Sequence, residues 1–457
     1  MRDLSSPGRA PMSLLTLLRP APNLEEIQDQ EVIKKNYRRM RLRIFYGMYI
    51  GYAFYYFTRK TFTFAMPAMQ AHLGLDKFEL GLIASILSLT YGASKFLSGI
   101  LGDRSNPRYF MSFGLILTAI FNIFFALSSS WWAFALFWGL NGWFQGWGWP
   151  SCAKLLTYWY SPSERGRWWS LWNTSHNLGG TLIPLLIAVA VELCGWRMAI
   201  LQTSVICIFI GFFLINRLRD TPQSLGLPPI EKYRDDHDQT ISQQDEHDSA
   251  KAILWKYVLT NKYVWVLAIA YFFIYIIRTA LNDWSMLYLQ ETKGYSSLIA
   301  GTCVCWFEVG GLFGSLAAGW GSDLLFKGRR MPINVLFTVG IFLILIAGFQ
   351  IVSIRSPFFD SLYQFCSGFF IFGPQMMIGM ACAELSHKKA AATATGFAGC
   401  FAYLGAAVAG GPIGALTNFW GWEGFFLSLS VCAIFALICV LPLWSIAKKA
   451  PPEVINS

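Results

Sequence analysis

Apolar stretches of about 20 residues recur along nearly the whole chain, and they constrain its fold more than any other feature. A helix of that length crosses a hydrocarbon core of about 30 Å, and inside lipid only helices and closed barrels satisfy every backbone polar group. We therefore predict an all-α polytopic membrane protein with twelve transmembrane helices. Their predicted centres lie near residues 54, 90, 119, 143, 180, 206, 273, 309, 342, 371, 404 and 434.

Composition and charge agree with a membrane protein. Of the 457 residues, 55% are hydrophobic and only 14% are charged, which is unlike an ordinary soluble domain. The net charge of +10 comes from Lys and Arg on one side of the predicted spans. Because cytoplasmic loops are rich in these residues, both termini are predicted to be cytoplasmic, and nucleic-acid binding is not expected. The basic side carries Lys34, Lys35, Arg38, Arg39, Arg41, Arg43, Arg104, Arg108, Arg165, Arg167, Arg217, Arg219, Lys327, Arg329, Arg330, Lys388, Lys389, Lys448 and Lys449, and the other side carries Lys77, Arg197, Lys293 and Arg355.

Residue types that commonly bind metals or cofactors are scattered along the chain. Ten cysteines are spread mostly through apolar stretches, without a CxxC pair or a His/Cys cluster, so no metal or cofactor is expected. No nucleophile stands beside a base, and an enzyme is not expected. A cleavable signal peptide is not expected ahead of the first span.

A polar segment at residues 217–256 divides the predicted spans into six and six. Its composition cannot bury a core, so it is predicted to be a cytoplasmic linker. The other predicted units are an N-terminal tail at 1–43, six-helix bundles at 44–216 and 257–446, and a C-terminal tail at 447–457.

The two halves are related in sequence. Gly99 and Asp103, at the cytoplasmic end of the second span, recur in the second half as Gly319 and Asp323, both displaced by the same interval, and basic residues follow both copies, beginning with Arg104. Glycine permits close helix packing, and the aspartate can cap the helix or pair locally. A repeat of six helices is the organisation of secondary transporters, which bind their substrate between the halves.

Two arginines lie inside apolar stretches at matched places. Arg59 and Arg278 are separated by nearly half the chain, almost the same interval as the glycines and aspartates, and each lies in the stretch that begins one half. A charge at bilayer depth costs about 2.5 kcal/mol or more, so an intramembrane arginine indicates function. The matched pair predicts one shared anion. An empty, closed pocket would hold unpaired charge at low dielectric, which favours exchange of anions over one-way transport.

Polar residues accompany the first arginine at helical spacing. Tyr52, Tyr56 and Arg59 share one helix face, which can cradle a phosphate group. The first span contains no carboxylate, so Arg59 is predicted to bind an external anion. Lys60 is turned by about 100° from Arg59, and it either points to the periphery of the cavity or forms an internal ion pair.

The second arginine has a similar stripe. Tyr275, Arg278 and Asn282 follow one another at i, i+3 and i+7. An alternative interpretation pairs Arg278 with Asp283 or Glu308, which would neutralise the arginine for a structural reason.

Further candidates lie in the second, fourth and fifth spans. Lys95 lies about 12 Å before the cytoplasmic end of its span, and it either guides substrate or extends its amine to the interface. His176 and Asn173 form a polar face, where His176 either donates to a phosphate oxygen or is satisfied by neighbouring polar groups. Gln145 and Trp149 supply an amide and an aromatic face that suit a sugar ring.

Several long runs along the chain match one known family. They are GYAFYYFTRKTFTFAMP, YGASKFLSGILGDRSN, NGWFQGWGWPSCAKLLTYWYSPSERGRWWSLWNTSHNLGG, RTALNDW and FGPQMMIGMACAE. Together they resemble the organophosphate:phosphate antiporter family of the major facilitator superfamily over nearly the whole chain, and most of all its UhpC-type hexose-phosphate sensor-transporters. The resemblance implies two six-helix halves. It implies phosphate binding by Arg59 and Arg278, with binding roles for His176, Lys95, Tyr52 and Tyr56.

The function implied by the resemblance is exchange of glucose 6-phosphate for inorganic phosphate, by a monomer that works through alternating access in the bacterial inner membrane. The alternative is a receptor for external glucose 6-phosphate that acts on a membrane histidine kinase. One departure from the family lies in the eleventh span, where Thr395 and Ala398 replace a charged pair tied to substrate selectivity.

Overall fold

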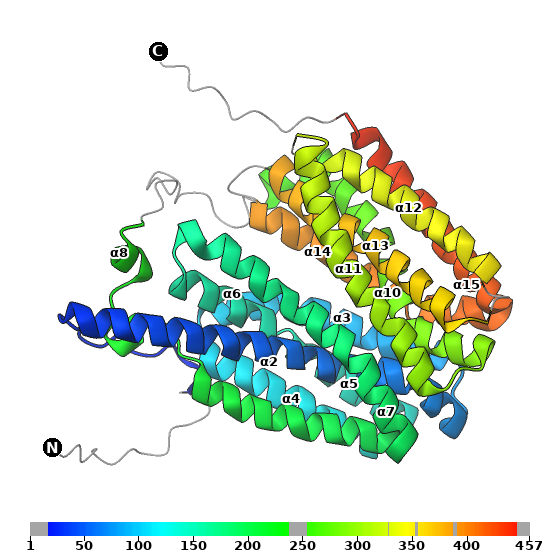
Figure 1. Ribbon diagram of the computed structural model, residues 1–457, viewed down its shortest axis with the longest axis horizontal. Helices are drawn as coiled ribbons and strands as arrows, with labels where there is room; N and C mark the ends of the chain where they lie inside the picture. Colours follow the sequence, from blue (N-terminus) through cyan, green and yellow to red (C-terminus); the bar gives the residue numbers. More distant parts are fainter. Residues whose placement is uncertain (1–16, 237–253, 328, 352–354, 387–390, 446–457) are drawn as a thin grey trace.

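The computed structural model describes residues 17–236, 254–327, 329–351, 355–386 and 391–445, and within these ranges every regular element is a helix (Figure 1). The short helical elements are η1 (Gln223–Leu225), α8 (Ile230–Arg234), η3 (Leu254–Leu259) and η5 (Leu441–Leu443). The long ones are α2 (Gln30–Leu73), α3 (Lys77–Asp103), α4 (Pro107–Leu127), α5 (Trp131–Gln145), α6 (Gly148–Trp159), α7 (Pro162–Arg217), α10 (Lys262–Lys293), α11 (Ser297–Leu324), α12 (Arg330–Ile351), α13 (Pro357–Leu385), α14 (Ala391–Val408) and α15 (Gly411–Val440).

The predicted all-α membrane fold is confirmed, and seven helical stretches of the described residues are long and apolar enough to cross a membrane. Two of the helices are interrupted. α7 folds back at Gly195 and α15 is kinked at Gly421, where φ values of 78° and 64° favour glycine. α5 continues into α6, and α14 continues into the part of α15 before Gly421. Each of the resulting twelve segments of the described chain contains one of the twelve predicted centres.

The helices form two groups that repeat one another. Figure 1 shows α2 to α7 packed together as an N-terminal half and α10 to α15 as a C-terminal half. Gly74 ends α2 and Gly294 ends α10, both in the left-handed conformation with φ of 69° and 62°. The interval between these two glycines is the same as the interval between the two copies of the repeated sequence motif.

The two halves contact each other at the end of the molecule that holds Gly74 and Gly294, which we call the closed end. There the Ser85 hydroxyl donates to the carbonyl oxygen of Ala407 at 2.5 Å and accepts from the Gly411 amide at 2.8 Å. A Cβ on Gly81 would lie 2.5 Å from the backbone oxygen of Gly410, the residue just before α15. Glycine is therefore required where the two helices approach each other. Toward the opposite end, the two groups of helices diverge (Figure 1).

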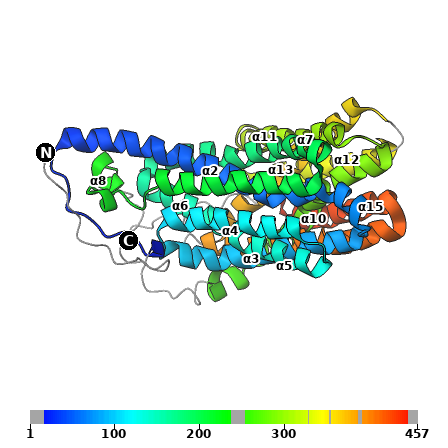
Figure 2. The ribbon, with the colours of Figure 1, turned by 90° about the horizontal axis from the view of Figure 1, so that it is seen from below.

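Two described segments outside the predicted spans are helical, although their composition predicts a tail and a linker. α2 begins at Gln30, so the second part of the predicted N-terminal tail is helical. The start of the predicted linker also folds, because Tyr37 stacks on Tyr233 of α8 with ring centroids 4.2 Å apart and donates to the carbonyl of Pro228. Figure 2 shows α8 beside the beginning of α2. Residues 237–253 of the linker and 447–457 of the C-terminal tail lie outside the described ranges.

Helix packing inside the C-terminal half depends on glycine contacts, and one substitution tests this. A Cβ on Gly310 of α11 would lie 2.0 Å from the backbone oxygen of Phe365 in α13, whereas a Cβ on Gly399 of α14 would meet nothing within 4 Å. We expect Gly310→Ala to destabilise the protein by about 1–3 kcal/mol through overpacking. Thermal unfolding in detergent measures the effect, and Gly399→Ala is the control. Equal midpoints for the two variants would contradict this packing.

Candidate functional site

A cavity between the two halves holds most of the predicted binding residues. Both arginines reach it, one from α2 and the other from α10, and the predicted lysine and histidine reach it from α3 and α7. Of the predicted residues, the cavity is lined by Tyr52, Tyr56, Arg59, Lys60, Lys95, Trp149, Asn173, His176, Tyr275, Arg278 and Asp283.

Aromatic rings and one amide hold Arg59. Its guanidinium carbon lies 4.7 Å from the ring centroid of Tyr56 and 4.3 Å from that of Tyr91. Its Nε and Nη2 both donate to Gln145 Oε1 at 3.4 Å. The contacts orient the guanidinium without neutralising its charge. Gln145 is only 1% exposed, donates to Thr58 Oγ1 and lies outside the cavity lining, so in this structure it supports Arg59 from behind.

Arg278 lies in a similar environment in the other half. Its guanidinium carbon is 5.7 Å from the ring centroid of Tyr275 and 5.1 Å from that of Phe372. Its Nε is buried without a hydrogen-bond partner, and no carboxylate oxygen of the described residues forms an ion pair with it. In this structure Arg278 therefore forms no direct ion pair with Asp283 or Glu308.

Lys60 forms the internal ion pair that the sequence left open. Its Nζ lies 2.5 Å from Asp283 Oδ1, and both side chains are largely buried, with 15% and 13% of their surface exposed. Lys60 also donates to the side-chain oxygen of Asn282. The pair joins α2 to α10 and thus connects the two halves at the cavity wall.

A buried amide network continues from this ion pair. Glu308 is 3% exposed and accepts from Asn177 Nδ2 and Asn282 Nδ2, both at 3.4 Å. Asn282 is 4% exposed and lies between Lys60 and Glu308, outside the cavity lining. In this structure it links the cationic and anionic members of the network, and its predicted contact with substrate stays a prediction.

Lys95 lines the cavity, as its predicted substrate role requires, and that role stays a prediction. Its Nζ lies 3.5 Å from the Tyr403 hydroxyl and 5.3 Å from the ring centroids of both Tyr403 and Trp149. On the neighbouring wall, the His176 ring stands 5.8 Å from the ring of Tyr56. A cation, an imidazole and aromatic faces therefore surround the arginine pair.

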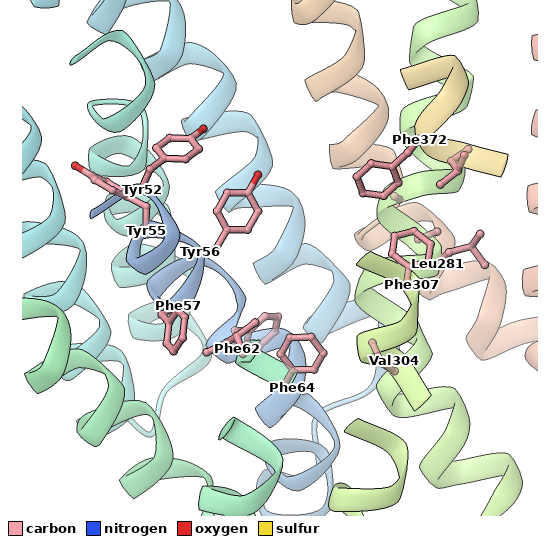
Figure 3. Close-up of a cluster of buried hydrophobic side chains, with 14 of the residues drawn as sticks. Tyr52, Tyr55, Tyr56, Phe57, Phe62, Phe64, Leu281, Val304, Phe307 and Phe372 are labelled. Atoms are coloured by element: carbon pink, nitrogen blue, oxygen red, sulfur yellow. The ribbon is translucent and has the colours of Figure 1, made fainter. Parts of the chain in front are cut away.

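Two tyrosines precede each arginine at the same spacing. Tyr52 and Tyr56 precede Arg59, and Tyr271 and Tyr275 occupy the same places before Arg278, each pair in edge contact at 6.0 and 4.8 Å. In Figure 3, Tyr52 and Tyr56 point toward the other half, where Phe307 and Phe372 lie, whereas Tyr55 points into its own half. The Tyr55 hydroxyl donates to the Met111 carbonyl at 2.7 Å, which fixes this inward orientation.

The cavity residues that the sequence analysis missed include Tyr91, Tyr403 and Gln375. Tyr91 and Tyr403 meet edge to face at 4.9 Å, and Tyr403 lies 6.0 Å from Tyr275, so aromatic rings bridge the two halves beside the arginines. Tyr91 stands four residues before Lys95 on one helix face, a signal that could have identified it. Tyr403 and Gln375 carry no comparable signal. Gln375 Oε1 is buried without a partner.

The repeated motif lies at the end opposite the closed end. Gly99 and Asp103 fall in the last turns of α3, where the Asp103 side chain is outside the described ones, and Arg104 is exposed. In the second copy Arg330 donates to Asp323 at 2.8 Å and to Glu384 at 3.3 Å, a local ion-pair network. A Cβ on Gly319 would meet only the Met376 Cε at 3.9 Å, so the predicted close packing at this glycine is wrong.

Residues 48–410 match the sequence model of the Major Facilitator Superfamily. Among curated proteins, the chain is 55% identical to the "Probable hexose phosphate transport protein" of Chlamydia trachomatis, over 96% of this chain and 99% of that one. It is 47% identical to the "Membrane sensor protein UhpC" of Escherichia coli K12, over 94% and 98%. It is 39% identical to the "Glycerol-3-phosphate transporter" of Bacillus subtilis, over 96% and 99%.

Solved structures with the same fold have very different sequences. A bacterial homologue of the human lysosomal transporter Spinster, in an inward-facing and occupied conformation, superposes with a TM-score of 0.71 at 13% identity. The superposition covers 88% of this chain and 96% of that one. At this identity the likeness concerns the fold alone.

The Lys60–Asp283 pair should be energetically coupled, because removing one partner leaves a largely buried charge unpaired. We expect Asp283→Asn alone to lower the thermal unfolding midpoint more than the double variant Lys60→Gln/Asp283→Asn. The coupling free energy should be at least about 1 kcal/mol. The same cycle on the more exposed Lys77–Glu291 pair is the control and should give less than about 1 kcal/mol. Additive effects at Lys60 and Asp283 would refute the coupling.

Proposed function

The chain belongs to the major facilitator superfamily, and from this premise we propose that it exchanges a hexose phosphate for inorganic phosphate across a membrane by alternating access. The observation that carries the proposal is the arginine pair, Arg59 and Arg278, which faces one cavity from both halves without a carboxylate partner among the described residues. Relatives named for hexose phosphate and glycerol-3-phosphate transport support a phosphorylated substrate.

The chemistry of the pair favours a phosphate group. A guanidinium presents N–H donors in a planar fork that matches two phosphate oxygens, and charge-assisted bonds of this kind are about twice as strong as neutral ones. Arg59 and Arg278 keep unused donors, because their neighbours are mostly aromatic rings. A phosphate between the halves would therefore satisfy both arginines at once.

The free-energy cost of burying unpaired charge favours exchange over one-way transport. When the halves close around an empty cavity, two like charges lose water while neither arginine has an ion-pair partner among the described residues, so the empty carrier resists the transition. Bound phosphate lowers this barrier in either direction. Moving a dianion against 100 mV would cost about twice 2.3 kcal/mol, whereas exchange for an anion of equal charge costs nothing electrically.

The remainder of the cavity suits a sugar. Lys95 and the rings of Trp149 and Tyr403 lie together beside the arginine pair, which gives one cation and two aromatic faces for a polyhydroxylated ring. His176 and Asn173 add hydrogen-bonding groups on another wall. Glucose 6-phosphate is therefore our proposed substrate, with inorganic phosphate as the counter-substrate.

The proposed setting is the inner membrane of a bacterium, with a monomer as the working unit and both termini in the cytoplasm. The basic residues that flank the helices at the end opposite the closed end support this orientation. In this orientation the closed end faces outward.

The second candidate function is sensing of external glucose 6-phosphate, with a membrane histidine kinase as the partner. It is favoured by the 47% identity to a protein named as a membrane sensor. The folded start of the linker, where α8 packs on α2, would offer a kinase a defined surface.

Transport in phosphate-loaded proteoliposomes tests the main proposal. Labelled glucose 6-phosphate should enter only when the vesicles contain phosphate. Arg59→Lys and Arg278→Lys should each lower the exchange rate by about 10- to 100-fold, because each loses a charge-assisted fork worth about 1.5–3 kcal/mol. Arg38→Lys, at an exposed position of α2, is the matched control and should leave the rate unchanged. Equal uptake into phosphate-free vesicles would disprove exchange.

Cells that lack other hexose-phosphate carriers separate the two functions. If the protein is a transporter, its expression should allow growth on glucose 6-phosphate as the carbon source. A sensor would instead activate a kinase-dependent reporter without supporting growth, and that result would contradict the transport proposal.

A further inference from the structure

Four arginines crowd around the last turn of α7, at the end of the N-terminal half opposite the closed end. Arg43 comes from α2, Arg108 from the first turn of α4, and Arg217 and Arg219 from the end of α7 and just beyond it. Arg43 Nη2 and Arg219 Nη1 donate to the same atom, the carbonyl oxygen of Asn216, at 2.6 and 2.8 Å. The two guanidinium groups therefore lie beside one another.

Backbone carbonyls at the end of α7 hold this arginine cluster in place. Arg108 Nε donates to the carbonyl of Ile215 at 2.6 Å, and Arg43 Nη2 also reaches Asn216 Oδ1 at 3.1 Å. The last carbonyls of a helix have no intrahelical partner and carry partial negative charge. They occupy only some of the five donors of each guanidinium and supply no full counter-charge.

The arginine cluster lacks an anion. None of the ion pairs within the described residues involves Arg43, Arg108, Arg217 or Arg219. The Nε atoms of Arg43 and Arg217 are buried without a hydrogen-bond partner. Burial and the nearby charges of Arg108 and Arg43 lower the pKa of Arg219 to about 10, which is the effect of like charges held close together.

An apolar, exposed surface adjoins the cluster. The Arg217 guanidinium carbon lies 5.8 Å from the ring centroid of Tyr46 and 5.4 Å from that of Phe213. Along the same part of α7, Phe209 and Phe212 are 68% and 59% exposed. Exposed rings in a membrane-spanning helix face lipid, and charged side chains beside them lie at the headgroup level. The cluster thus stands where acyl chains give way to phosphates.

We propose that Arg43, Arg108, Arg217 and Arg219 bind the phosphodiester headgroup of an anionic phospholipid. Guanidinium forks recognise phosphate oxygens, and the unused donors of four arginines from α2, α4 and the end of α7 converge on one place. A bound headgroup relieves the repulsion among them and ties these three helices together. Free phosphate offers the same oxygens, but the adjoining apolar surface favours a lipid.

Lipid retention measured by native mass spectrometry tests the site. The protein is purified in detergent micelles that contain equal amounts of phosphatidylglycerol and phosphatidylcholine. The double variant Arg43→Gln/Arg219→Gln should lower the ratio of retained phosphatidylglycerol to phosphatidylcholine by at least about tenfold. This expectation follows because each arginine near an anionic headgroup strengthens binding by about fivefold, or about 1 kcal/mol.

The matched control is Arg38→Gln/Arg39→Gln, which removes two exposed charges from the same helix. It should change the ratio by less than about threefold, because it leaves the cluster intact. If the ratio fell equally in both double variants, diffuse surface charge and not a specific site would retain the lipid, and the proposal would be wrong. An unchanged ratio in the cluster variant would also overturn it. If the glutamine variant does not fold, Arg43→Lys/Arg219→Lys keeps the charge, loses the forks and should still lower the ratio by about threefold or more.

A second experiment distinguishes a lipid ligand of the arginine cluster from a free anion. The thermal midpoint of each variant is measured with inorganic phosphate and without added lipid. Phosphate also reaches the transport cavity, so only the difference between the cluster variant and the control reports on the cluster. An equal phosphate-dependent shift in both supports a lipid ligand, and a shift lost in the cluster variant alone would assign the site to a free anion.

Discussion

Among the described residues, no carboxylate forms an ion pair with Arg59 or Arg278, and this sets the conditions for the rest of the structure. Aromatic rings cover both guanidinium groups, and Gln145 supports the first, so their positions are fixed while their charge stays available. A membrane protein that keeps two such charges between its halves must receive an anion there before the halves can close without a large cost in free energy.

The two halves share a sequence repeat, but their side-chain contacts at the cavity differ. Tyrosines stand at the same places before each arginine, yet Lys60 corresponds to Thr279 in the repeat, so only the N-terminal half sends a lysine across to Asp283. Gln145, also from the N-terminal half, contacts Arg59 from behind. The Lys60–Asp283 pair and the Ser85 hydrogen bonds hold one end closed, and the cavity lies between them and the diverging helices.

The sequence predicted the fold class, the number of spans and the repeat, because lipid forces apolar helices of fixed length and the spacing of matched residues is visible in the chain. It also predicted which helix faces carry Arg59, Arg278 and His176. It could not predict partners that depend on how helices from different halves meet. Asp283 pairs with Lys60 instead of Arg278, Asn282 and Gln145 lie behind the cavity wall, and Tyr403 reaches the cavity from a helix with no local polar signal. The ordered start of the linker depends likewise on the distant contact between Tyr37 and Tyr233.

The account rests on one phosphate that is held by both arginines together, and the affinity for inorganic phosphate tests this most directly. Calorimetric titration of the purified protein, of Arg59→Gln, of Arg278→Gln and of the double variant forms a thermodynamic cycle. If both guanidinium groups bind the same phosphate, each single variant should lose nearly as much affinity as the double variant. Fully additive losses, or a loss confined to one arginine, would contradict the shared site.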